Sequence, residues 1–261
     1  MRVCFVCSKT TASTTRSAAT WMSPQVPSEL NSDHVDEAMS VLRRHHEDTF
    51  SGLQSPIVGQ ALQHKSLPKF LAAGNKRFVQ IFNTGDHWVC ATNVFSSSTH
   101  VVYVYDSMYS HVSDSLVLQV SSLLREEDYP DEVEFVVRHF KQQTIGTRIC
   151  GFYAVAACVA CVLREDPTGR LYDEVAMGEA YVKLINQGVI EPFPSQAVEC
   201  CDPMPSVKRR KLHCLCHKPF TGSMIQCDSC KYWFHMKNCV REPATPRTLR
   251  GVVWKCPCCS R

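Results

Sequence analysis

One unbroken apolar run limits how this chain can fold. From Phe152 to Leu163 the sequence reads FYAVAACVACVL and contains no charged residue. A helix that is apolar all round must be covered on every side, and this run is about half as long as a bilayer core requires. We therefore expect a helix buried inside a folded domain, entered through a polar loop that ends at Cys150 and Gly151.

Cys150 would lie in the first turn of that expected helix. The unpaired N–H groups of a helix N-terminus carry partial positive charge, which favours the thiolate, and the thiolate is the nucleophilic form of cysteine. Gly151 beside it would let a substrate backbone come close. The alternative is that Cys150 is an ordinary small buried hydrophobe.

Composition and cysteine usage narrow the class of protein. The 261 residues are enough for one or two domains, and 44% hydrophobic with 20% charged residues is typical of globular proteins. The N-terminal sequence lacks a long apolar region, so we expect a soluble intracellular protein with no membrane contact. Eight of the 16 cysteines lie between Cys214 and Cys259, which favours reduced thiols and bound metal over disulfides.

Composition and periodicity divide the chain into four parts. Residues 1–28 are rich in Ser, Thr, Ala and Pro and predict a disordered leader. Residues 29–196 predict a globular domain, 197–211 a basic linker, and 212–261 a small metal-binding domain. Residues 208–261 hold 12 Lys and Arg against 2 acids, which leaves 16 against 23 in the rest of the chain. The linker ends in the basic cluster 208–211, which is either simply solvated or a patch for nuclear import or nucleic acid.

Within residues 29–196 the pattern alternates between helices and strands. A helix capped by Ser32 or Asp33 should end near His46. Segments with strand composition lie at 78–82, 88–95, 101–106 and 133–140, and further helical patterns lie at 115–125 and 173–187. This order predicts an α+β fold.

Three polar residues complete a possible catalytic set with Cys150. His87 opens the second of the expected strands, Asp106 closes the third, and Gln143 lies in the loop before Cys150. Thiol hydrolysis requires a base, a group that orients the base, and donors for the oxyanion. Each residue singly is also typical of a surface turn, a strand end or a loop.

This ordered set resembles the ubiquitin-like protein proteases, the family of SUMO-deconjugating and adenovirus-type cysteine peptidases. The resemblance rests on GDHWV, VYDSM, KQQTIG and ICGFYA. It implies an α+β, papain-like core with Cys150 as nucleophile, His87 as base and Asp106 as its orienting partner. The oxyanion donor would be Gln142 or Gln143, because Gln143 stands seven positions before Cys150 where the family commonly has six. Ile149 stands where the eukaryotic deconjugating enzymes commonly have Asp.

The C-terminal segment has the ligands for two tetrahedral zinc ions. So short a segment, poor in apolar residues, would need metal to fold. It resembles the PHD finger, which implies interleaved ligand sets. These are Cys214, Cys216, His235 and Cys239 on one zinc, and Cys227, Cys230, Cys256 and Cys259 on the other. Cys258 is the alternative to Cys259 as the last ligand.

The PHD resemblance also implies binding of a histone tail. Phe220, Met224 and Trp233 match positions of the aromatic or thioether cage that holds methyl-lysine. The alternative for Met224 and Trp233 is that they complete a very small core.

Together these features predict a nuclear cysteine peptidase that cleaves ubiquitin-like modifiers or related substrates and that a PHD finger targets to chromatin. The combination resembles proteins derived from transposable elements. One rival prediction is a chromatin-binding protein whose peptidase domain is catalytically degenerate. Another is a viral-type processing peptidase that uses nucleic acid through its basic segment.

Overall fold

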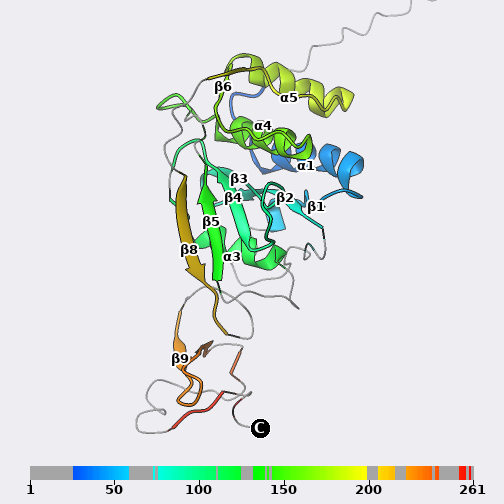
Figure 1. Cartoon of the computed structure of the whole chain (residues 1–261). Helices are drawn as coiled ribbons and strands as arrows, with labels where there is room; N and C mark the ends of the chain where they lie inside the picture. Colours follow the sequence, from blue (N-terminus) through cyan, green and yellow to red (C-terminus); the bar gives the residue numbers. More distant parts are fainter. Residues whose placement is uncertain are drawn as a thin grey trace, which may run out of the picture.

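The computed structural model shows a mixed sheet with helices on both faces, followed by a small cysteine-rich unit (Figure 1). Its described residues are 26–58, 73, 76–109, 111–124, 132–138, 140, 143–198, 205–214, 222–236, 239–240, 253–256 and 259. Most of the expected leader, together with Gln142, Cys216, Phe220 and Cys258, lies outside these residues.

The main sheet has six strands in the order β1-β2-β3-β4-β5-β8. The strands are β1 (Ser51–Gly52), β2 (Phe78–Asn83), β3 (Trp88–Thr92), β4 (Val101–Tyr105), β5 (Glu132–Val137) and β8 (Ser206–Lys211). The pairs β1–β2 and β4–β5 are parallel, whereas β2–β3, β3–β4 and β5–β8 are antiparallel. The sheet is therefore mixed, and the predicted α+β class is confirmed.

Each face of the sheet carries its own apolar core. Helices α1 (Ser32–His46), α4 (Cys150–Val162) and α5 (Ala176–Gln187) cover one face, and α3 (Asp114–Leu123) covers the other (Figure 1). Helix α4 lies directly on β2 and β3, with α1 and α5 packed against it. A two-stranded antiparallel sheet of β6 (Arg170–Tyr172) and β7 (Ser195–Ala197) is formed by the segments on either side of α5 in the chain.

Helix α4 begins at Cys150 and all 13 of its residues are buried, as the apolar run predicts. Its buried surface stabilises the domain by roughly 1.5–3 kcal/mol for each large side chain. No helix in the described part of the chain has both the length and the apolar character to cross a bilayer.

Helix α1 ends at His46 as expected, but its cap is one residue earlier than the sequence indicates. Asn31 is the N-cap: its side chain accepts a hydrogen bond from the His34 backbone N–H, and the His34 side chain accepts one from the Asn31 N–H. The prediction of Ser32 or Asp33 is wrong because Asn is an equally good cap and because His34 completes the reciprocal pair.

The basic cluster expected to be linker is strand β8. It pairs with β5 along its whole length, from Glu132 opposite Lys211 to Val137 opposite Ser206. Arg209 contacts Glu134 at 3.1 Å, and Arg210 donates to the carbonyl of Val112. Acidic side chains on β5 therefore balance part of the charge that made this segment look solvated.

The residue after β8 is built into the core of the sheet. Leu212 is 1% exposed and packs with the apolar side chains beneath α3, including Phe135 and Val137 of β5. The segment is thus an integral part of the large domain.

We predict that Leu212→Ala lowers the free energy of unfolding by about 2–5 kcal/mol, because it opens a cavity in a close-packed core. Val207→Ala is the matched control, since Val207 lies on β8 but is 48% exposed, and it should cost less than about 1 kcal/mol. Urea denaturation of both variants measures the difference. Equal small effects would mean that β8 and Leu212 are a linker after all.

Candidate active site and metal sites

The sheet brings His87 and Asp106 together. His87 directly precedes β3 and Asp106 directly follows β4, and these strands are antiparallel neighbours with Cys90 opposite Tyr105. The start of one strand therefore lies beside the end of the other. His87 Nε2 and Asp106 Oδ1 are 2.7 Å apart, and the two residues are only 3% and 7% exposed.

The loop after β4 holds the Asp106 carboxylate in place. Besides the His87 ring, Oδ1 accepts hydrogen bonds from the backbone N–H groups of Met108 at 2.8 Å and Tyr109 at 2.9 Å. The Tyr109 ring also packs edge-on against the His87 ring, with centroids 5.2 Å apart. The orientation of His87 is thus set from two sides.

His87 Nδ1, the ring nitrogen that does not bond Asp106, is the one available to Cys150. Nδ1 is buried and makes no hydrogen bond of its own within the described structure, whereas Nε2 is occupied by Asp106. Burial lowers the pKa of His87, but the Asp106 carboxylate and the nearby Cys150 sulfur outweigh it and raise the pKa to about 9. A proton on His87 is therefore favoured when a carboxylate and a thiolate flank the ring.

Cys150 is the first residue of α4 and is 8% exposed. The helix has no side-chain cap at Ile149, so no side chain of that residue takes up the N–H groups of the first turn. Cys158 and Cys161 lie further along the same helix and are fully buried, and burial raises the pKa of both thiols. Position and environment therefore distinguish Cys150 from its neighbours.

Gly151 serves packing rather than substrate approach. A Cβ at this position would lie 2.7 Å from Leu30 Cβ and 3.4 Å from Trp88 Cδ1. The space that we expected a substrate backbone to use is filled by Leu30, whose carbonyl oxygen accepts a hydrogen bond from Trp88 Nε1.

Gln143 is buried beside the end of β4. Its side-chain oxygen accepts a hydrogen bond from Ser107 Oγ at 3.0 Å, and its Nε2 donates to the carbonyl of Thr147 at 2.7 Å. The residue is 8% exposed. Gln143 is thus tied to the residue that follows Asp106.

A cavity of about 310 Å³ borders the His87–Asp106 pair. Its lining includes Asp86, Tyr109 and His111 in addition to the pair itself. Sequence reasoning missed Tyr109, although its place three residues after Asp106, in a turn that caps the carboxylate, is a usable signal.

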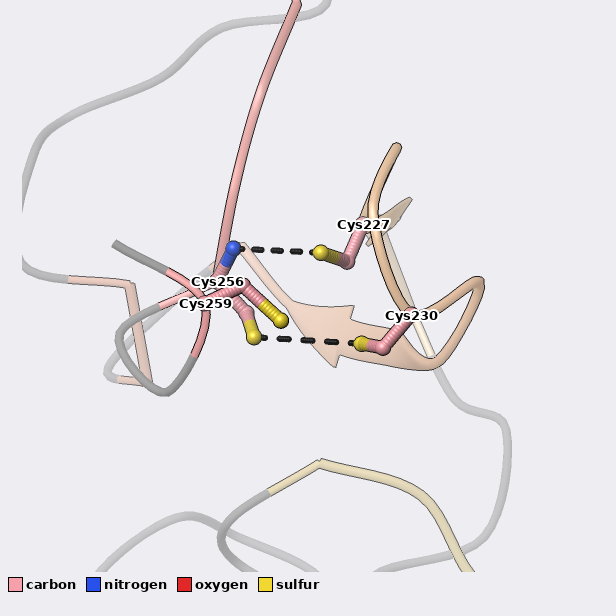
Figure 2. A group of neighbouring side chains, drawn as sticks. All are labelled: Cys227, Cys230, Cys256 and Cys259. Carbon is pink, nitrogen blue, oxygen red and sulfur yellow. Dashed lines mark hydrogen bonds between the residues drawn. The ribbon is translucent and has the colours of Figure 1, made fainter. Parts of the chain in front are cut away.

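The cysteine-rich unit gathers its ligands in two groups, as the interleaved pattern predicts. The sulfur atoms of Cys227, Cys230, Cys256 and Cys259 lie within 4.8 Å of one another, and Figure 2 shows them converging from two chain segments. The second group is Cys214, His235 and Cys239. Cys259 thus belongs to the first group, while Cys216 and Cys258 lie outside the described residues.

A short hairpin supports both groups. Strands β9 (Met224–Gln226) and β10 (Trp233–His235) are antiparallel, with Trp233 opposite Gln226. Alternate residues of a strand point to opposite faces. Phe234 and Ile225 share the face that packs in the small core with Trp254.

Met224 and Trp233 lie on the other face of that hairpin. Both are partly buried, and neither belongs to the core around Phe234. Phe220, the third predicted cage residue, lies outside the described residues.

Comparison with known proteins relates a short part of the chain to a named protein. No family model matches. A stretch of 53 residues is 43% identical to the Set1 complex component spp1 of Schizosaccharomyces pombe. The match covers 20% of this chain and 12% of that relative, so the chain spans about one eighth of the relative's length.

We predict that the protein loses stability as the pH rises from 6.5 to about 9. The pKa of His87 is raised by folding, so its contribution is complete below the unfolded value of 6.5 and disappears as the pH passes the folded value. The loss is at most about 3 kcal/mol. Urea denaturation on both sides of this window measures it, and His87→Asn should remove it. An equal loss in the variant would assign the effect to other groups.

Proposed function

We propose that this protein is a cysteine peptidase of the ubiquitin-like protease type with a zinc-binding, PHD-type finger. The observation that carries the proposal is the His87 ring, buried between the Asp106 carboxylate and the Cys150 thiol at the start of a helix. The α+β fold, with Cys150 at the start of a buried apolar helix, fits the papain-like core that the family resemblance implies.

The proposed reaction has two halves. The Cys150 thiol gives its proton to His87 Nδ1, and the sulfur attacks the carbonyl carbon of the scissile bond. His87 then donates the proton to the leaving amine, which departs as the thioester forms. Water attacks the thioester with His87 as base, and Cys150 regains its proton. The raised pKa of His87, about 9, favours transfer of the thiol proton to its ring.

Asp106 acts through orientation. Its bond to Nε2 fixes the imidazole so that Nδ1 faces the sulfur, and its charge stabilises the imidazolium. The oxyanion would be held by the uncapped N–H groups at the start of α4 and by the amide of Gln143. One N–H of that amide bonds Thr147, which leaves the other for the substrate.

The rival of a degenerate scaffold is disfavoured because His87, Asp106 and Cys150 are all present and adjacent. The substrate would be a ubiquitin-like modifier or another protein. A viral-type processing peptidase with nucleic acid on the basic strand fits less well, since Arg209 and Arg210 are engaged within the domain.

The finger would hold two zinc ions, because thiolate and imidazole donors in groups of four are typical of structural zinc. The four-cysteine group is complete, and the other group has three ligands among the described residues, with Cys216 as the proposed fourth. The metal would fold this small unit.

We further infer that Met224 and Trp233 read a methylated histone tail and that the protein acts in the nucleus. Both side chains lie on the face of the hairpin opposite to Phe234 and in diagonal register, and an aromatic ring and a thioether suit a quaternary ammonium group. The similarity to a component of the Set1 complex supports the nuclear part of this inference.

Activity is tested with vinyl-sulfone and propargyl derivatives of ubiquitin and several ubiquitin-like modifiers. The wild-type protein should form an adduct with at least one, and Cys150→Ser should form none. Cys158→Ala is the matched control on the same helix and should label normally. Asp106→Asn should label slowly, since the comparable change in serine triads costs about four orders of magnitude. Labelling that persists in Cys150→Ser would refute the assignment, and an inert wild-type protein would favour the scaffold role.

Tail recognition is tested by titrating the full chain with a trimethyl-lysine histone peptide and its unmodified form. Trp233→Ala should remove a preference on the order of tenfold, because the cation loses its π face. Val253→Ala, which removes an exposed apolar side chain of the finger, should retain the preference. Both variants should keep their metal by mass spectrometry. Binding that ignores methylation would leave the basic surface as the attraction.

A further inference from the structure

The segment 143–149, here named the nucleophile loop, is a closed turn that delivers the chain to Cys150. Thr147 donates to the Thr144 carbonyl through both its N–H and its hydroxyl, at 3.1 and 2.7 Å. Gly146 has φ +85, a conformation that glycine adopts without strain. The Gln143 amide closes the turn by bonding Thr147.

One end of the nucleophile loop is fastened to the end of β4. The Gln143 N–H donates to the Ser107 carbonyl at 3.0 Å, and Ser107 Oγ donates to the Gln143 side chain. This contact alone leaves the turn free to pivot relative to α4, because both bonds lie at its first residue.

A second anchor comes from Glu174, in the turn before α5. One carboxylate oxygen accepts the Thr144 N–H at 2.9 Å, and the other accepts the Thr144 hydroxyl at 2.8 Å. The first oxygen also accepts the hydroxyl of Tyr153 at 3.0 Å. Tyr153 lies on α4 three residues after Cys150, so one carboxylate joins the loop to the helix that carries the nucleophile.

Both sides of this anchor are rigid. Tyr153 is completely buried, and its ring packs edge-on against Phe140 and Tyr172. Asp173 caps the turn that holds Glu174 by accepting hydrogen bonds from Val175 and Ala176. The anchored loop therefore has little freedom to move relative to Cys150.

We propose that Glu174 is a positioning residue that holds the nucleophile loop, and with it the Gln143 amide, in register with Cys150. The inference rests on the proposed function, because it assigns the loop a role in the same reaction. An oxyanion donor acts only when it is held at the correct place before the reaction, and displacements of about 1 Å cost up to about a hundredfold in rate. Ser107 and Glu174 together fix both sides of the turn.

The kinetic test uses the coumarin amide of whichever modifier labels the wild-type protein. Glu174→Ala should lower kcat by about ten- to a hundredfold with little change in KM, as expected when a contact is used only in the transition state. Glu174→Gln should recover part of the loss, since its amide still accepts from Thr144 and Tyr153. Glu191→Gln is the matched control, because Glu191 is an exposed glutamate that contacts only Lys183 among the ion pairs described, and it should match wild type.

A double-mutant cycle separates positioning from general destabilisation. If Glu174 acts through Thr144, then Thr144→Ala combined with Glu174→Ala should be no slower than Glu174→Ala alone. Additive losses, or a loss confined to KM, would overturn the proposal.

Hydrogen exchange tests the clamp even if no modifier reacts. The amides of residues 144–149 should exchange faster in Glu174→Ala than in wild type, while those of α4 beyond its first turn should not change. Unchanged exchange in the loop would refute the proposal whatever the activity. If the wild-type protein reacts with no modifier but Glu174→Ala speeds exchange in the loop, the peptidase assignment is refuted and the positioning role of Glu174 stands.

Discussion

The packing of α4 against β2 and β3 sets the distance between Cys150 and His87. Cys150 is the first residue of α4 and His87 directly precedes β3, so the positions of this helix and this strand determine where the two residues lie. Protein interiors are close-packed and resist small displacements, and every residue of α4 is buried. The chemistry proposed here therefore depends on an apolar contact that contains no reacting atom.

Leu30 strengthens this contact from outside the sheet. Its side chain fills the space beside Gly151, and its carbonyl accepts the Trp88 indole N–H at 3.1 Å. Gly151 follows the nucleophile and Trp88 follows the base, so a single residue before α1 touches the neighbours of both. The segment that precedes the domain's first helix is thus part of the support of the site.

Features that depend on neighbouring residues were predictable from the sequence, whereas those that depend on distant partners were not. The start of α4 at Cys150 follows from local composition, whereas the grouping of Cys227 and Cys230 with Cys256 and Cys259 follows from the resemblance to the PHD finger. Strand β8 was missed because its charges suggest solvent, and the acids that balance them lie on β5, about 75 residues earlier. Glu174 was missed for the same reason, since Thr144 lies 30 residues away along the chain.

Almost no linker separates strand β8 of the sheet from the finger. Cys214 follows Lys211 with only two residues between, and Tyr232 of the finger donates to the carbonyl of the buried Leu212. A flexible tether would let a recognised tail and a cleavage site adopt many separations. A strand permits only a narrow range of separations between the finger and the catalytic site. Binding of a tail and a cleavage site at the same time is therefore either strongly favoured or sterically forbidden. If the proposed function holds, the finger would select substrates whose cleavage site lies at a set distance from the methylated lysine.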